Sequence, residues 1–235
     1  MTQNFTRLKT LQELDSDLKT LRDNLEEVPK RIKHLQDETA RAESALATVQ
    51  GDITEHKKQY KLADVELKAA EEKIATYSVQ LYSAKTNEQY KAFLKEIETQ
   101  KKTKQGIEDR MIVLMEESEA LERQRVSVEK THSELKADSE KKVKSLEEEK
   151  AELEAAIAER EKHRAEVLDG LDSQLLKLYE RIRAKKSGIA VVVASDGKCQ
   201  GCFNPVPAQR VLEIARQDRV YTCEACGRIL LPDDK

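Results

Sequence analysis

Four cysteines are the residues whose type and spacing could do chemistry. They form two CxxC pairs, Cys199 with Cys202 and Cys223 with Cys226, and 20 residues separate the pairs. This spacing is typical of a structural zinc site, because each two-residue gap lets a tight turn present both sulfurs to one ion. Four thiolates complete a tetrahedral shell and leave no open position for water or substrate. The pattern therefore predicts one structural Zn²⁺ and no chemistry at the metal.

Iron is an alternative on ligand type alone, and a disulfide or a redox-active pair is a second alternative. The stretch "MTQNFTRLKTLQEL" at the start of the sequence lacks the apolar core of a secretory signal peptide. No stretch approaches the roughly 18 consecutive apolar residues of a membrane span. We therefore expect a cytoplasmic protein, and cytoplasmic thiols stay reduced. This favours metal binding over a disulfide.

The other residue types give no sign of an active site. The four histidines, at positions 34, 56, 132 and 163, are scattered, and the seven glycines form no phosphate-binding loop. No nucleophile, base and cleft converge in the pattern, so the sequence predicts a protein that is not an enzyme.

The composition indicates long helices around this site. Only 38% of residues are hydrophobic and 37% are charged, yet the net charge is −3. Disorder would fit the low hydrophobicity, but the apolar residues are regularly spaced. Abundant Ala, Glu, Lys, Leu and Arg at regular apolar spacing are typical of coiled coils.

Two heptad rows run through residues 11–84, and each has a single polar exception, Thr39 or His56. The first row is Leu11, Leu18, Leu25, Ile32, Thr39, Leu46, Ile53, Tyr60, Leu67, Ile74 and Leu81. The second row is Leu14, Leu21, Val28, Leu35, Ala42, Val49, His56, Ala63, Ala70, Tyr77 and Ala84. A 3–4 apolar spacing sustained over about ten heptads predicts a coiled coil. The phase carries through Pro29, which predicts a kink there and not a reversal.

A second helical run should start near Asn87, because Thr86 and Gln89 form a capping-box pattern, and last to about Lys186. Two amphipathic helices joined by a turn near 84–88 should fold back as an antiparallel hairpin. Partners summing to 170 or 171 would set Tyr77 against Phe93 and Leu35 against Leu135. The predicted fold class is mainly α, with a coiled-coil hairpin over residues 1–187 and a small β zinc ribbon over 188–235.

Both ends of the hairpin offer candidate partner-binding residues. Those near the turn are Thr86, Asn87, Tyr90, Lys101 and Lys102. A basic collar of Arg181, Arg183, Lys185 and Lys186 ends the second helix, and the candidates within it are Arg183, Lys185 and Lys186. Favourable placement of cations at a helix C-terminus also explains the collar, and Gly188 supplies a helix stop. The second run overhangs the first from Leu168 to Ile182. That apolar stretch needs cover from the C-terminal module or from a second copy of the chain.

The sequence of the C-terminal module predicts a zinc ribbon. "IAVVVAS" predicts a strand, "DG" at 196–197 a turn, "RVLEIAR" a helix, and "DRVYTC" and "GRILLPDD" further strands. Core packing or an apolar docking patch would account for Phe203, Tyr221, Ile229, Leu230 and Leu231. Six Lys/Arg balance six Asp/Glu over residues 188–235, whereas a ribbon committed to nucleic acid should be plainly basic.

The segments "GIAVVVASDGKCQGC", "YTCEACGRILLPDD" and "KTNEQYKAFLKEIE" resemble the bacterial C4-type zinc-ribbon proteins that carry a long helical hairpin. The resemblance covers essentially the whole chain and implies that the four cysteines bind zinc. It also implies an adaptor or chaperone-like role. Some members are linked to flagellar or type III secretion and to an RpoN-type sigma factor, and RNA binding has been proposed.

We therefore expect a non-catalytic adaptor that presents its ribbon and its hairpin tip to protein partners, or a hairpin that dimerises. The alternative is a nucleic-acid-binding regulator, of RNA or DNA, that uses the ribbon and the basic collar.

Overall fold

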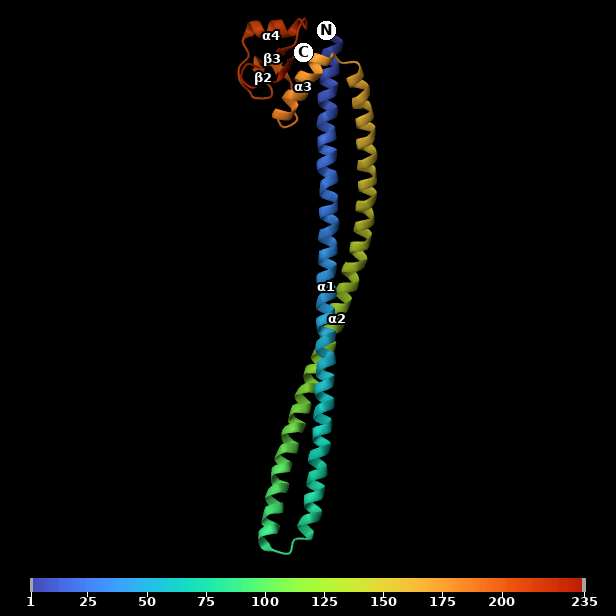
Figure 1. Ribbon diagram of the computed structural model, residues 1–235, viewed down its shortest axis with the longest axis vertical. Coiled ribbons are helices and arrows are strands. Elements are labelled where there is room, and N and C mark those ends of the chain that lie inside the picture. The colour runs from blue at the N-terminus through green and yellow to red at the C-terminus, as the bar shows by residue number, and fades with distance from the viewer. Residues whose placement is uncertain (1, 234–235) are drawn as a thin grey trace. The chain divides into compact units, whose positions relative to one another are not determined.

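The computed structural model describes residues 2–233, and two long antiparallel helices account for most of them (Figure 1). Helix α1 spans Thr2–Tyr82 and helix α2 spans Asn87–Asp169. This confirms the predicted fold class of a coiled-coil hairpin followed by a small β module. Residues 1 and 234–235, at the outer ends of the two predicted domains, lie outside the described residues.

The described chain divides into two compact units. One is His34–Lys142, the turn-proximal part of the hairpin, and the other combines the residues up to Lys33 with those from Val143 onward. The second unit thus contains the base of the hairpin together with the ribbon. Helix α1 continues through Pro29 without interruption, and the kink near this residue stays a prediction.

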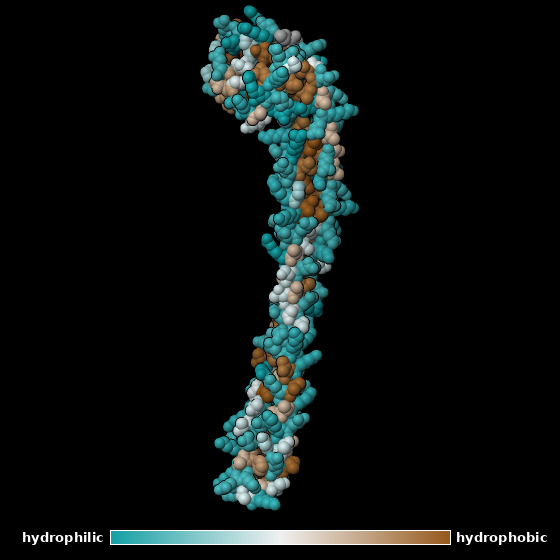
Figure 2. Space-filling model, viewed as in Figure 1, coloured by the Kyte–Doolittle hydropathy of each residue, from teal (hydrophilic) through white to brown (hydrophobic). Residues whose placement is uncertain are grey.

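Polar side chains cover most of the long helices, and apolar side chains show in bands along them (Figure 2). In the turn-proximal unit, Ala63 and Ala70 of α1 pack with Ile107 and Met111 of α2. Paired charges such as Lys104 with Glu71, 2.7 Å apart, flank this seam. Exposed pairs of this kind contribute only about 0–1 kcal/mol each, so the apolar seam holds the helices together.

The turn between α1 and α2 follows the predicted capping pattern. The Thr86 hydroxyl accepts a hydrogen bond from the Gln89 N–H at 3.2 Å, and the Gln89 side chain accepts one from the Lys85 N–H at 3.2 Å. The rings of Tyr77 and Phe93 lie 6.3 Å apart, as the pairing rule predicts. Further along, the Ser139 hydroxyl donates to the Leu35 carbonyl at 3.5 Å. The predicted pairing of Leu35 with Leu135 stays a prediction.

The second helix does not run on to Lys186, contrary to the sequence prediction. It ends at Asp169, and helix α3 starts afresh at Ser173 and ends at Lys185. The Asp172 carboxylate caps α3 by accepting from the N–H groups of Gln174 and Leu175 at 2.9 and 3.1 Å. The Arg7 guanidinium donates to the Gly170 carbonyl at the break. The helix therefore breaks where a new N-cap is available.

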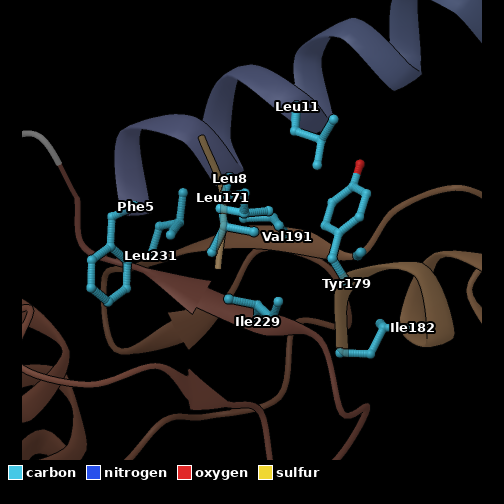
Figure 3. Close-up of a cluster of buried hydrophobic side chains, with 10 residues drawn as sticks. Phe5, Leu8, Leu11, Leu171, Tyr179, Ile182, Val191, Ile229 and Leu231 are labelled. Carbon is cyan, nitrogen blue, oxygen red and sulfur yellow. The ribbon is translucent and has the colours of Figure 1, made fainter. Parts of the chain in front are cut away.

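The predicted overhang is replaced by a buried cluster that we call the base core (Figure 3). Its members come from the start of α1, from the α2–α3 connection, from α3 and from the ribbon. They are Phe5, Leu8, Leu11, Leu171, Tyr179, Ile182, Ala190, Val191, Ile229 and Leu231. The ribbon and α1 of the same chain thus cover this apolar stretch. From the sequence, a second copy of the chain was the alternative.

A buried carboxylate ties α3 to the two long helices. The side chain of Asp15 is 3% exposed. It accepts hydrogen bonds from the Tyr179 hydroxyl at 2.6 Å, from Arg164 at 2.7 Å and from Arg183 at 3.1 Å. Burial, and then the hydrogen bond to Asp15, raises the pKa of Tyr179 well above its ordinary value, so the phenol keeps the proton that it donates. A buried carboxylate with three hydrogen-bond donors is stable, but removing the carboxylate or its donors lowers the stability of the fold.

Replacement of Asp15 by alanine should therefore loosen α3. Arg164, Arg183 and Tyr179 would lose their common acceptor, at a cost of about 3–5 kcal/mol. The measurement is amide hydrogen exchange over residues 173–185, which should become faster. Asp17→Ala is the matched control, since Asp17 is exposed and lies 3.7 Å from Arg160 alone. Equal exchange in the two variants would contradict the assigned role of Asp15.

Candidate metal centre

The ribbon is a four-stranded sheet with one short helix. Its elements are β1 Val191–Ser195, β2 Lys198–Cys199, α4 Ala208–Ala215, β3 Tyr221–Thr222 and β4 Ile229–Leu231. The strand order is β2-β1-β4-β3, with β1 and β4 parallel and the other neighbours antiparallel. The strands, the turn at 196–197 and the helix lie where the sequence predicts them. The first CxxC pair begins at the last residue of β2 and the second directly follows β3, and the sheet brings the two pairs together.

Both CxxC pairs adopt one backbone geometry. The N–H of Phe203 bonds to the Cys199 carbonyl at 2.7 Å, and the N–H of Gly227 bonds to the Cys223 carbonyl at 2.7 Å. Each of these two residues follows the second cysteine of its pair, and each has a left-handed backbone, with φ of 60° and 77°. Glycine adopts this region without steric cost, whereas phenylalanine does not. The first turn therefore carries backbone strain that the second turn avoids.

The four sulfurs form a compact group that fits a tetrahedral metal. All lie within 4.8 Å of one another, and no other group of potential ligands is found among the described residues. Cys199 and Cys226 are 3.9 Å apart, and Cys202 and Cys223 are 3.7 Å apart. Zn–S bonds of about 2.3 Å in a tetrahedron require about 3.8 Å between sulfurs, whereas a disulfide requires about 2.0 Å. The chain therefore has one structural zinc site with a saturated shell.

The protein environment divides the thiols into two kinds. Burial raises the pKa of Cys199 to about 12, against the opposing effect of the Gly201 and Cys202 N–H groups. Burial also raises the pKa of Cys223. The backbone and side-chain amides of Asn204 instead lower the pKa of Cys202 to about 6. Cys202 is thus the thiol that loses its proton before metal binding, whereas the metal must displace the protons of the two buried thiols.

The tentative partner-binding residues fall into two groups. Thr86, Asn87, Tyr90, Lys101 and Lys102 are all exposed in the turn-proximal unit, and Lys102 pairs with Glu98 at 2.8 Å. Lys185 is exposed and Lys186 caps α3. Arg183 is committed to Asp15 and Glu180 within the base. A buried carboxylate holds the Arg183 guanidinium, and a role of Arg183 in partner binding stays a prediction.

Sequence reasoning missed two residues that the structure makes prominent, Tyr82 and Gln12. Tyr82 is 92% exposed beside the turn, and Gln12 contacts the start of the ribbon. Phe203 is 69% exposed, whereas the other four members of the suggested apolar patch are buried. A tyrosine next to a predicted turn could have signalled the first residue. Nothing local could have signalled Gln12, whose partners lie far away in sequence.

The fold and the site together define a class, that of coiled-coil hairpins that carry a four-cysteine zinc ribbon. A family model described as a CT398-like coiled-coil hairpin domain matches residues 11–187, and a model described as a C4-type zinc ribbon domain matches residues 198–230. The chain belongs to the CT398-like coiled-coil hairpin family. This confirms the resemblance found in the sequence.

Solved structures share the whole fold. CT398 from Chlamydia trachomatis superposes with a TM-score of 0.88 at 20% identity, over 98% of each chain. A protein from Mycobacterium smegmatis gives 0.75 at 20% identity, over 97% of this chain and 98% of that one. HP0958 from Helicobacter pylori gives 0.58 at 19% identity, over 98% of each chain.

An uncharacterized protein of Mycobacterium tuberculosis H37Rv is 28% identical over 138 residues, which cover 58% of this chain and 56% of that relative. The match thus spans little more than half of the relative. Among residues 2–233, no helix has the length and apolar character needed to cross a bilayer.

Zinc affinity should rise with pH. Cys199 and Cys223 hold their protons at neutral pH in the metal-free ribbon, because burial raises the pKa of both. Binding must release these two protons, so affinity should increase by at least about 100-fold per pH unit around neutrality. Chelator competition at several pH values measures the slope. A zinc affinity that does not change with pH would contradict this prediction. Cys202, with a pKa of about 6, should steepen the pH dependence of the affinity only in more acidic solution.

Proposed function

We propose that the chain is a non-catalytic adaptor that binds protein partners through exposed aromatic side chains on its ribbon and at its hairpin turn. The observation that carries this proposal is Phe203, which is 69% exposed in a left-handed backbone conformation. The equivalent position of the second turn is Gly227, which adopts the same conformation without strain. A large aromatic side chain at this position adds nothing to the fold that glycine would not supply.

The hairpin turn also exposes apolar side chains. Val79, Tyr82, Tyr90 and Leu94 are all well exposed within a few residues of the turn. Tyrosine supplies contact area at low entropic cost, and it is enriched in protein interfaces. Lys101 lies close by in sequence and is exposed. This combination supports contact with a protein surface that has apolar pockets and some acidic groups.

The finer proposal follows the family resemblance. An RpoN-type sigma factor or a component of a secretion apparatus is the partner class that the family implies, and a chaperone-like role or a homodimer would use the same exposed groups. A nucleic-acid-binding regulator is less well supported than the sequence allowed. In the described residues, Arg181, Lys185 and Lys186 of the predicted collar lie outside the Asp15 network, and a small basic surface gives weak phosphate binding.

Phe203→Gly should abolish partner binding by the ribbon and leave the metal in place. Glycine relieves about 1 kcal/mol of backbone strain, so zinc content and thermal stability should equal or exceed those of the native chain. The assay is binding of the purified full-length chain to the RpoN-type sigma factor of the same organism. Loss of at least tenfold in affinity is expected.

Gln209→Gly is the matched control, since Gln209 is also exposed on the ribbon. The double variant Tyr82→Ser/Tyr90→Ser tests the turn in the same assay. Unchanged binding by Phe203→Gly and by the double variant would refute the exposed aromatic residues as the contact. Binding that weakens steeply with salt, and that disappears when Lys185 and Lys186 are reversed in charge, would instead support a charged partner.

A further inference from the structure

We propose that Gln12, a residue of the first long helix, is a positioning residue for the zinc site and determines how firmly the ribbon holds its metal. Gln12 touches none of the four cysteines. Its side chain instead fixes the segment through which the chain enters the ribbon, and that segment is hydrogen-bonded to both metal-binding turns.

The Gln12 side chain makes hydrogen bonds with both of its polar atoms. Its Oε1 accepts from the N–H groups of Ala190 and Val191 at 2.6 and 3.0 Å. Its Nε2 donates to the Gly188 carbonyl at 3.0 Å and to the Ser16 hydroxyl at 3.1 Å. A single amide thus pairs with three backbone groups between the end of α3 and the start of β1. Its hydrogen bonds take the place of those that a neighbouring strand would make with these backbone groups.

The segment that Gln12 holds is linked to the second turn through Arg228 and Ile229. Ala190 donates its N–H to Gln12, and its carbonyl accepts from the Ile229 N–H at 2.8 Å. Ile229 follows Arg228, whose carbonyl accepts from the Cys223 N–H at 2.7 Å. Two hydrogen bonds and one peptide link therefore separate the Ala190 backbone from that of a zinc-binding cysteine.

Arg228 extends the connection to the first turn. Its Nε donates to the Ile189 carbonyl at 3.0 Å, and its Nη1 donates to the Gly201 carbonyl at 2.9 Å. Gly201 lies between Cys199 and Cys202. A β carbon added there would lie 2.8 Å from Val192 and 2.9 Å from the Arg228 side chain. The start of β1, Arg228 and the first turn therefore have little room to move independently.

Apolar packing works in the same direction. Val191, Ile229 and Leu231 face the base core together with Phe5, Leu8 and Leu11 of α1. The docked strands β1 and β4 thus adjoin the metal-binding turns, since β1 pairs with β2, which ends at Cys199, and β4 follows the second turn. Two equilibria that share one ordered element are linked, so docking and metal binding strengthen each other by the same factor.

The test uses zinc-loaded full-length protein and the rate of zinc transfer to a chromogenic chelator. Gln12→Met keeps the length of the side chain and removes its hydrogen bonds, so transfer should be roughly tenfold faster. Gln12→Glu keeps an acceptor for Ala190 and Val191 but loses both donors, so the acceleration should be smaller. Gln36→Met, at an exposed glutamine of α1 in the other unit, should leave the rate unchanged.

Hydrogen exchange over residues 188–193 gives a readout that does not depend on the chelator, and it should become faster in the order native, Gln12→Glu, Gln12→Met. A native transfer rate in folded Gln12→Met would overturn the proposal. An equal acceleration by Asp15→Ala, which leaves the Gln12 contacts in place, would also overturn it, since general docking would then explain the effect. Each variant must retain the native helical content by circular dichroism, so that loss of the fold is not mistaken for the predicted result.

Discussion

The ribbon is too short to bury a core of its own, and most of the architecture around it follows from this constraint. A module of this size needs a metal or an external surface for stability, and this chain has both. Four thiolates tie its two turns to one ion. One set of side chains from β1 and β4 packs against α1, while another set forms a small cluster with α4. The hairpin base and the metal stabilise the same strands.

The network around Asp15 shows how a polar group can serve a packed interface. An isolated carboxylate at this depth would be strongly destabilising, but three donors from α2 and α3 satisfy it. Its geometry specifies where α3 can lie, since a displaced helix would take the donors Tyr179 and Arg183 away from the Asp15 carboxylate. Apolar packing alone would tolerate small shifts of α3, so the network gives the base its defined arrangement.

Local patterns predicted the elements well. Heptad spacing gave the two long helices, the pairing of Thr86 with Gln89 gave the turn, and the CxxC spacing gave the metal ligands. The break at Gly170 was missed because the leucine spacing continues across it, although Asp172 offers a ready N-cap. The roles of Asp15 and Gln12 depend on partners more than 140 residues away in sequence. No periodicity within one helix carries that information. The exposure of Phe203 likewise depended on which face of the turn the sheet would cover.

The composition of the base core has a consequence for the order in which the chain can fold. Phe5 and Leu8 leave the ribosome long before Ile229 and Leu231. The hairpin turn can form in the meantime from neighbours that are close in sequence, and such local contacts form quickly. The apolar start of α1 must wait for the ribbon, so a nascent chain presents an uncovered apolar stripe until the ribbon has emerged. Chaperones that bind such stripes therefore have a defined period in which to act on this protein.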